Sequence, residues 1–110
     1  MHFTHAKFTA IGWVGTLREV GKTLKIRISK TESWKDRESG ERRDRTIWNT
    51  VTVFENTPGY AWLKENLKVG DLVTIEGELF EDSYEKDGQK IFDTTLKANF
   101  VAVLPNGKGE

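Results

Sequence analysis

Apolar and polar residues follow a strand-like pattern through most of this chain. The clearest case lies between Leu24 and Ser29, where every second residue is apolar and Lys25 and Arg27 lie between. Period-two alternation is the signature of a β-strand that has one buried and one solvated face. Strands are predicted over residues 3–17, 24–29, 47–54, 73–79 and 92–104.

Glycine and charged residues separate these strands. Gly12 and Gly15 interrupt the first strand, where glycine often marks a bulge or a barrel corner. A short turn is expected at residues 19–22, and Asp87-Gly88 is a strong hairpin signal. Residues 35–45 are highly charged and contain a glycine, so we expect a solvated hairpin loop there.

One helix is predicted between the third and fourth strands. Thr57 is suited to the N-cap, Pro58 to the first helical position and Gly70 to the end. Three residues between them are spaced for one helix face: Tyr60, Leu63 and Leu67. Five strands with this helix between the third and fourth is the arrangement of the OB-fold, a five-stranded Greek-key barrel, although other small β-barrels share the pattern. We expect one all-β domain at residues 1–105 and a short polar end at 106–110.

The third strand places aromatic residues on a polar face. Trp48 and Phe54 lie six residues apart and share that face with Thr50 and Thr52, so the face looks wet. Trp34 precedes the basic loop. Exposed rings among cations suit unpaired bases, because rings stack on bases and cations follow phosphates. The pattern equally allows Trp48 and Phe54 to cap a core.

Charge and composition narrow the function classes. The net charge is zero, but residues 1–55 carry +4 and residues 56–110 carry −4, either by chance or because one side of the molecule is positive. The chain has no cysteine, no apolar run that could span a membrane and no signal-peptide pattern near Met1, so we expect a cytoplasmic protein.

Nothing in the sequence predicts an enzyme. His2 and His5 are the only histidines, and no nucleophile, metalloprotease or phosphate-loop motif is present. The acidic residues alternate along strands or lie in loops, which favours a solvated face over a metal site. We therefore expect no catalytic residue, no metal and no cofactor.

Three blocks of the chain resemble the bacterial single-stranded DNA-binding proteins, a family with phage and plasmid members. The strongest is TESWKDRESGERRDRTIWNTVTVF at 31–54, which keeps the family's Ser-x-Trp, basic hairpin, Thr-x-Trp and Val-x-Phe pattern. The others are LKVGDLVTIEGEL at 67–79 and YEKDGQKIFDTTL at 84–96. The resemblance covers about residues 10–104.

The resemblance implies roles for particular residues. Trp34, Trp48 and Phe54 match the family's base-stacking aromatics, and Tyr84 falls where many members carry tryptophan. Lys35 and Arg37 match basic residues of the family's second-to-third strand hairpin. Charge and expected exposure add weaker candidates for phosphate contacts: Lys7, Arg18, Lys25, Arg27, Arg43 and Arg45.

The chain also departs from the family pattern. Asn49-Thr50 replaces the usual His-Arg, which puts one subunit contact and one DNA contact in doubt. A typical member continues past the position of Leu104 into a linker and an acidic tip that recruits other proteins. The residues after Leu104 in this sequence do not follow that pattern, so we expect no acidic-tail-dependent partners. Trp13 and Trp62 match no binding position; Trp62 is expected to pack the helix, and Trp13 to be core, interface or an extra stacker.

The resemblance implies a function without catalysis. We expect sequence-independent binding and protection of single-stranded DNA in DNA replication, recombination or repair. Like the family, the chain is expected to form a homo-oligomer, a tetramer in preference to a dimer. The alternatives are a primosomal-type OB protein that bridges single strands and replication proteins, and an OB module that binds protein or sugar.

Overall fold

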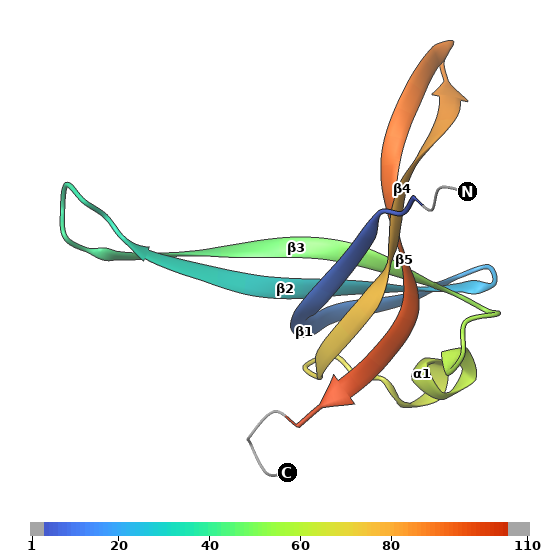
Figure 1. Ribbon diagram of the computed structural model, residues 1–110, viewed down its shortest axis with the longest axis horizontal. Coiled ribbons are helices and arrows are strands. Elements are labelled where there is room, and N and C mark those ends of the chain that lie inside the picture. The colour runs from blue at the N-terminus through green and yellow to red at the C-terminus, as the bar shows by residue number, and fades with distance from the viewer. Residues whose placement is uncertain (1–3, 106–110) are drawn as a thin grey trace.

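The computed structural model describes residues 4–105, which form one closed β-barrel with a single helix. The elements are β1 (Lys7–Val20), β2 (Thr23–Lys35), β3 (Arg42–Phe54), α1 (Tyr60–Asn66), β4 (Leu72–Lys86) and β5 (Gln89–Leu104). Around the barrel the strands follow the order β1-β2-β3-β5-β4 (Figure 1). This arrangement is the OB-fold, as predicted. The predicted start of the first strand at Phe3 and the predicted polar end at 106–110 lie outside the described residues.

Strand β1 serves both halves of the barrel. It pairs with β4 from Lys7 to Trp13 and with β2 from Trp13 to Val20. Gly15 has no partner in the second ladder, so it forms a β-bulge. A Cβ on Gly12 would lie 2.6 Å from the carbonyl oxygen of Ser29, which shows how closely the backbones approach there. Gly15 therefore marks a bulge, as expected, and Gly12 marks a close approach of two backbones.

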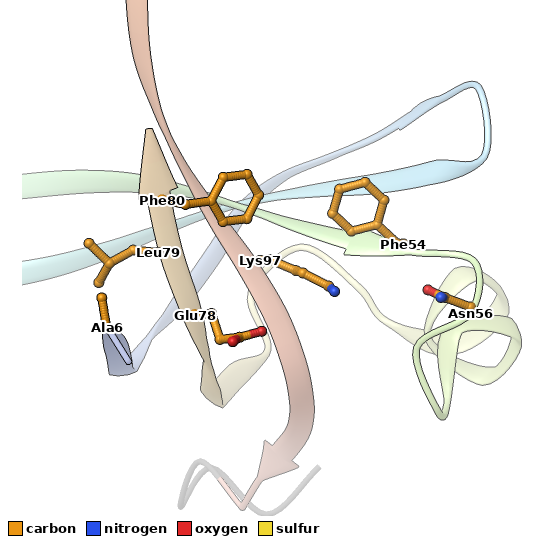
Figure 2. Close-up of a pocket in the computed structure, with 7 residues that line it drawn as sticks. All are labelled: Ala6, Phe54, Asn56, Glu78, Leu79, Phe80 and Lys97. Carbon is orange, nitrogen blue, oxygen red and sulfur yellow. The ribbon is translucent and has the colours of Figure 1, made fainter. Parts of the chain in front are cut away.

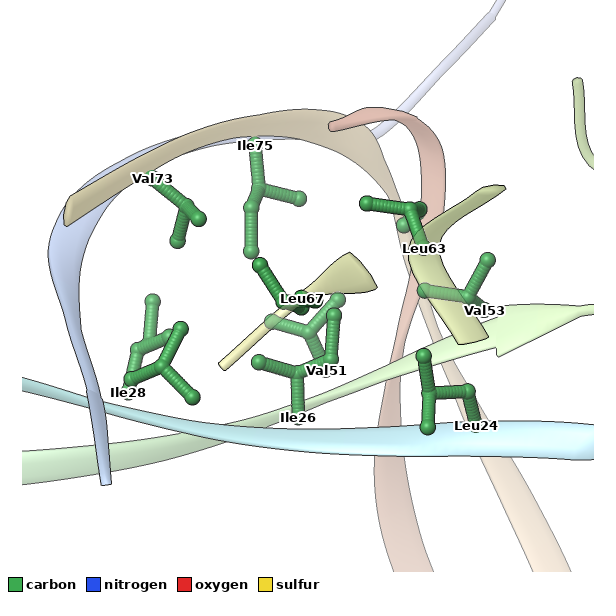
Figure 3. Close-up of a cluster of buried hydrophobic side chains, with 11 residues drawn as sticks. Leu24, Ile26, Ile28, Val51, Val53, Leu63, Leu67, Val73 and Ile75 are labelled. Atoms are coloured by element: carbon green, nitrogen blue, oxygen red, sulfur yellow. The ribbon is translucent and has the colours of Figure 1, made fainter. Parts of the chain in front are cut away.

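The barrel interior is aliphatic (Figure 3). The alternating residues of β2 contribute Leu24, Ile26 and Ile28, and the helix contributes Leu63. The remaining buried members are Val14, Val51, Val53, Leu67, Val73, Ile75 and Ala98. Burial of a valine, leucine or isoleucine side chain contributes roughly 1.5–3 kcal/mol, so this cluster is the main source of stability.

Two long hairpins leave the barrel as arms (Figure 1). The first is the β2–β3 arm, residues 30–46, where the expected loop at 35–45 is wrong in extent. The ladder continues outward to the pair Lys35 and Arg42, so only residues 36–41 connect the strands. Antiparallel backbone hydrogen bonds need no apolar face, and polar contacts such as that between Ser33 and Asp44 join the strands instead.

The second is the β4–β5 arm, residues 78–95. Its turn was predicted correctly: Asp87 and Gly88 both have positive φ, 53° and 78°, as a two-residue type I′ turn requires. Both strands extend further toward the turn than predicted, because they pair with each other beyond the barrel. Leu79 alternates in β4 with the buried residues Val73 and Ile75, yet it is 37% exposed at the point where the arm leaves the barrel.

A bulge interrupts the alternation of β5. The even residues from Phe92 to Leu104 would share one face of a regular strand, but Glu76 pairs with Phe100 and Gly77 with Ala98, leaving Asn99 unpaired. One extra residue reverses the inside and outside positions of a strand. Ala98 is buried, whereas Phe100 is 51% exposed.

The helix differs from prediction at its ends and on its surface. Its N-cap is Gly59, not Thr57, which is buried and donates a hydrogen bond to the carbonyl oxygen of Ala98. The helix ends at Asn66, before Gly70. Trp62 is 54% exposed, so the expectation that it packs the helix is wrong. No helix within residues 4–105 is long and apolar enough to cross a membrane.

Candidate nucleic-acid interface

Trp48 packs against Gly15 of the barrel, and one cation lies over its ring. The residue sits on β3 opposite Ser29 of β2, and its ring packs so closely on Gly15 that a Cβ there would lie 2.4 Å from a ring carbon. The guanidinium of Arg27 is 4.2 Å from the ring centroid. Trp48 remains 42% exposed, so it does not cap the core, and part of its ring faces solvent.

Three of the predicted cations surround a hollow close to Trp48. The hollow measures about 310 Å³ and is lined by Arg18 from β1, Lys25 and Arg27 from β2, and Thr50 from β3. Strand alternation places Lys25, Arg27, Thr50 and Trp48 on the same outer face, because Arg27 is the ladder partner of Thr50. A polyanion would therefore meet three positive side chains beside an exposed aromatic ring.

The outer face of β3 is less wet than predicted. Thr52 is 4% exposed, although it lies between two residues of that face, Thr50 and Phe54. Lys25 donates a 2.8 Å hydrogen bond to the Thr52 hydroxyl oxygen, and β5 runs alongside at Lys97. Closure of the barrel covers this threonine, and the sequence of β3 alone carries no sign of that.

Phe54 lines a second hollow, at the base of the β4–β5 arm. The hollow measures about 350 Å³, and Figure 2 shows the side chains around it. The ammonium of Lys97 lies 5.8 Å from the centroid of the Phe54 ring. The other lining residues are Ala6, Asn56, Glu78, Leu79 and Phe80. Sequence reasoning missed Phe80 and Lys97.

A weak signal could have found one of these two residues. Phe80 lies four residues before Tyr84 and so has the same strand parity, which would have placed both on one face. Lys97 carried no such signal. Its position at this hollow depends on its ladder partners, Glu78 on β4 and Thr52 on β3.

Trp34 lies apart from Trp48, toward the outer end of the β2–β3 arm. It is 46% exposed and lines a hollow of about 340 Å³ with Lys35 and Arg42. Its ladder partner is Arg43, whose parity differs from that of Trp48, so the two tryptophans lie on opposite faces of the β2–β3 ribbon. A strand of nucleic acid that touches both must pass around an edge of the arm.

Ion pairs hold two of the predicted cations. Arg43 bonds Asp36 and Arg45 bonds Glu32, each at 2.8 Å. The Arg45 side chain lowers the pKa of Glu32 below its ordinary 4.5. The backbone N–H of Glu38, followed by Arg43, lowers the pKa of Asp36. These arginines must exchange a carboxylate for a phosphate before they can bind DNA. Lys35 and Arg37 form no ion pair with the described residues.

The last two predicted residues lie away from this cluster. Tyr84 is 52% exposed on the β4–β5 arm. Lys7 is opposite Glu78 in the β1–β4 ladder and lines a separate hollow with Phe100. The structure thus gathers Arg18, Lys25 and Arg27 near Trp48, places Trp34, Lys35, Arg37, Arg43 and Arg45 on one arm and Tyr84 on the other, and leaves Lys7 apart. From Thr4 to Pro105, no group of three or more potential metal ligands occurs.

Comparison with known proteins connects this geometry to a family. The family model described as "Single-strand binding protein family" matches residues 8–104. A single-stranded DNA-binding protein of Rhizobium meliloti (strain 1021) is 39% identical over 79 residues, which cover 66% of this chain and 45% of that protein. The match therefore spans less than half the length of that relative.

Solved structures share the same fold. The mitochondrial single-stranded DNA-binding protein of S. cerevisiae aligns with a TM-score of 0.66 at 28% identity, covering 96% of this chain and 100% of that one. The Plasmodium falciparum SSB, solved in complex with ssDNA, aligns with a TM-score of 0.73 at 19% identity, covering 96% and 99%. The likeness to the second structure supports the fold alone.

Proposed function

Because this chain belongs to the single-strand binding protein family, we propose that it binds and protects single-stranded DNA irrespective of sequence. Members of this family are DNA-binding proteins and not enzymes, so the proposal includes no reaction. It needs no cofactor, since base stacking and counterion release supply the affinity. The processes served are those that expose single strands: replication, recombination and repair. We therefore propose that the protein acts in the cytoplasm, where a bacterial cell carries out these processes.

The arrangement at Trp48 carries the proposal. An exposed ring lies against the barrel, Arg27 lies on it, and Arg18 and Lys25 line the adjoining hollow. A ring stacks on any unstacked base, and cations beside it meet the phosphates on either side of that base. In a duplex the base faces are already stacked on one another, so this surface favours single strands.

The proposal assigns two kinds of contact. The stacking residues are Trp34, Trp48, Phe54 and Tyr84. The phosphate-contacting residues are Lys35, Arg37, Arg18, Lys25 and Arg27, with Arg43 and Arg45 joining them after their carboxylate partners are displaced. Lys7 is left out of this assignment, because it lies on β1 opposite Glu78 and lines a separate hollow with Phe100, away from Trp48.

We also propose a homo-oligomer, a tetramer in preference to a dimer. The outer face of the β1–β4–β5 sheet carries Ile11 at 58%, Trp13 at 40% and Phe100 at 51% exposure. Leu72 and Leu104, opposite each other in the β4–β5 ladder, share this face. An apolar sheet face of this kind is typical of a protein–protein interface. Light scattering at micromolar concentration should give a multiple of 12.6 kDa, and a mass of 12.6 kDa would contradict the proposal.

The DNA-binding proposal is tested by titration of the intrinsic tryptophan fluorescence. Oligo-dT should quench the emission, and a duplex of equal length should do so much less in moderate salt. Affinity for oligo-dT should fall with salt, with a log–log slope of about −0.7 for each phosphate contact. Equal affinity for the two forms of DNA would contradict the proposal, and a flat salt response would exclude the assigned phosphate contacts.

A further inference from the structure

The hollow at the base of the β4–β5 arm gathers side chains that the family resemblance does not assign. Glu78 and Lys97 are direct partners in the β4–β5 ladder, and Phe80 lies two residues further along β4. Lys97 also pairs with Thr52 of β3, and Phe54 lies two residues beyond Thr52. Strand alternation therefore brings Phe54, Glu78, Phe80 and Lys97 to one face of the sheet.

The side chains around this hollow form a mixed aromatic and cationic surface. Figure 2 shows the rings of Phe54 and Phe80 on either side of the Lys97 side chain. Phe80 is 39% exposed, and no ion pair within 4 Å holds Lys97 among residues 4–105. An exposed phenylalanine beside a free ammonium suits a ligand with one flat apolar face and one negative group, which describes a nucleotide.

We propose that Phe80 and Lys97 complete a nucleotide subsite with Phe54, in which Phe80 contacts the same base as Phe54 and Lys97 binds the adjoining phosphate. The inference rests on the proposed binding of single-stranded DNA and adds two residues to it. The volume of about 350 Å³ lies in the range of roughly 300–1,000 Å³ that small-molecule sites occupy. Asn56 adds a polar amide at the rim.

The carboxylate of Glu78 opposes phosphate binding at Lys97. Its carboxylate lies directly across the ladder from Lys97, so a phosphate that approaches Lys97 also approaches a negative charge. Glu78 therefore weakens the phosphate contact, and Glu78→Gln should tighten binding of oligo-dT by about twofold. A merely structural role for this face would give no gain beyond that of Glu81→Gln, which removes the same charge elsewhere on the arm.

A double-mutant cycle tests the shared base. Phe80→Ala should weaken binding of oligo-dT by about tenfold, as loss of one stacking contact does. Phe80→Leu, which keeps an apolar side chain but removes the ring, should lose several-fold. If both rings hold one base, the double variant Phe54→Ala/Phe80→Ala should lose less than the product of the two single losses. Losses that multiply would mean separate bases and would overturn the shared subsite.

Phe92 is the matched control. It is 63% exposed on the same arm, but its partner Ser83 places it on the opposite face from Phe80. Phe92→Ala should leave the affinity for oligo-dT unchanged. Lys97→Gln should make the salt slope shallower by about 0.7, the contribution of one phosphate.

The outcomes separate this inference from the proposed function. A folded Phe80→Ala variant that binds oligo-dT as tightly as the parent protein would overturn the subsite and leave the proposed single-strand binding intact. An unchanged salt slope in Lys97→Gln would overturn the phosphate contact. Parent protein that fails to bind oligo-dT at all would overturn both proposals.

Discussion

The two arms share a backbone design and differ in chemistry. Each is an antiparallel hairpin that continues two barrel strands outward (Figure 1). The β2–β3 arm holds six basic and five acidic residues, so its net charge is +1; the β4–β5 arm holds two and six, so its net charge is −4. Four ion pairs lie within the β2–β3 arm, and none is found among the residues of the β4–β5 arm, all of which the structure describes.

This difference shows why a neutral protein can present a cationic surface. Carboxylates within the β2–β3 arm hold Arg43 and Arg45 in ion pairs, so these two arginines can bind a polyanion only after exchange of partners, whereas Lys35 and Arg37 form no ion pair with the described residues. Three cations without a carboxylate partner among residues 4–105 lie together where β1 and β2 meet: Arg18, Lys25 and Arg27. Under the proposed function, the negative charge of the β4–β5 arm disfavours phosphate along most of its length, so we expect DNA to contact this arm only at its base and at Tyr84.

The largest expected effect is on stability, and it separates a glycine at the base of the β4–β5 arm from one at the tip of the β2–β3 arm. A Cβ on Gly77 would lie 1.9 Å from the backbone carbonyl oxygen of Lys97, so Gly77→Ala must distort the base of the β4–β5 arm. We expect a loss of about 3 kcal/mol or more in the free energy of unfolding, measured by urea denaturation at fixed protein concentration. Gly40→Ala, at the tip of the β2–β3 arm, meets open space at φ +74° and should lose about 1 kcal/mol. Equal losses would contradict this account.

A smaller effect, on binding, should separate the aromatics of the two arms. Trp48→Ala should lose about 1–3 kcal/mol of binding free energy for oligo-dT, because it removes a ring backed by Gly15 and Arg27. Tyr84→Ala should lose less, since its ring stands on an acidic arm. Trp62→Ala is the control: this side chain is 54% exposed on α1, so affinity and stability should both stay near the parent values.

That comparison has a clear contrary result. If Trp48→Ala is unfolded by circular dichroism, the ring of Trp48 has a structural role in the barrel and the proposed base-stacking role is contradicted. A greater loss of affinity in Tyr84→Ala than in Trp48→Ala would place the main stacking site on the β4–β5 arm.

Charge removal should have a still smaller effect, and one that differs between the arms. Glu32→Gln releases Arg45 from its 2.8 Å ion pair, so affinity for oligo-dT should rise by about two- to fivefold. Glu81→Gln removes the same charge from the β4–β5 arm, where no cation is released, and should raise affinity less. Fluorescence titrations in low salt measure both, and 0.5 M salt should abolish most of the difference.

The smallest effect concerns pH. Because the pKa of Glu32 is lowered in the folded protein, its ion pair is complete above pH 4.5 and is lost as the pH falls through the lowered value. The pKa of Asp36 is also lowered, from its ordinary 3.8, so its pH dependence has the same direction. NMR titration of Arg45→Gln should show that the pKa of Glu32 returns toward its ordinary 4.5. An unchanged midpoint in that variant would show that Arg45 does not cause the shift.

The sequence was sufficient for the elements of the fold, because each is specified locally. Alternation in 24–29 identified a strand whose apolar residues are all buried, and Asp87-Gly88 specified its turn through two positive φ angles. The pattern was insufficient where distant segments decide the outcome. A bulge at Asn99 reverses the face that regular alternation would give Phe100, and barrel closure buries Thr52.

The candidate site followed the same rule. The exposure of Trp34, Trp48 and Tyr84 was predictable from polar neighbours along the strand. Which cations gather near Trp48 was not, because that depends on how β1 crosses from β4 to β2. The ion pairs of Arg43 and Arg45 depend on ladder register, so charge counting overstated both as ready phosphate contacts.

The closure of the barrel between β3 and β5 bears on the order in which the chain folds. These strands meet through one parallel pair, Thr52 with Lys97, which lie 45 positions apart in the chain. The β2–β3 and β4–β5 hairpins close short loops, and their entropic barriers are correspondingly low. We expect this pair, like the β1–β4 ladder in which Lys7 and Glu78 lie 71 positions apart, to form after both hairpins. Such non-local pairing predicts folding on the millisecond-to-second timescale of comparable β-topologies.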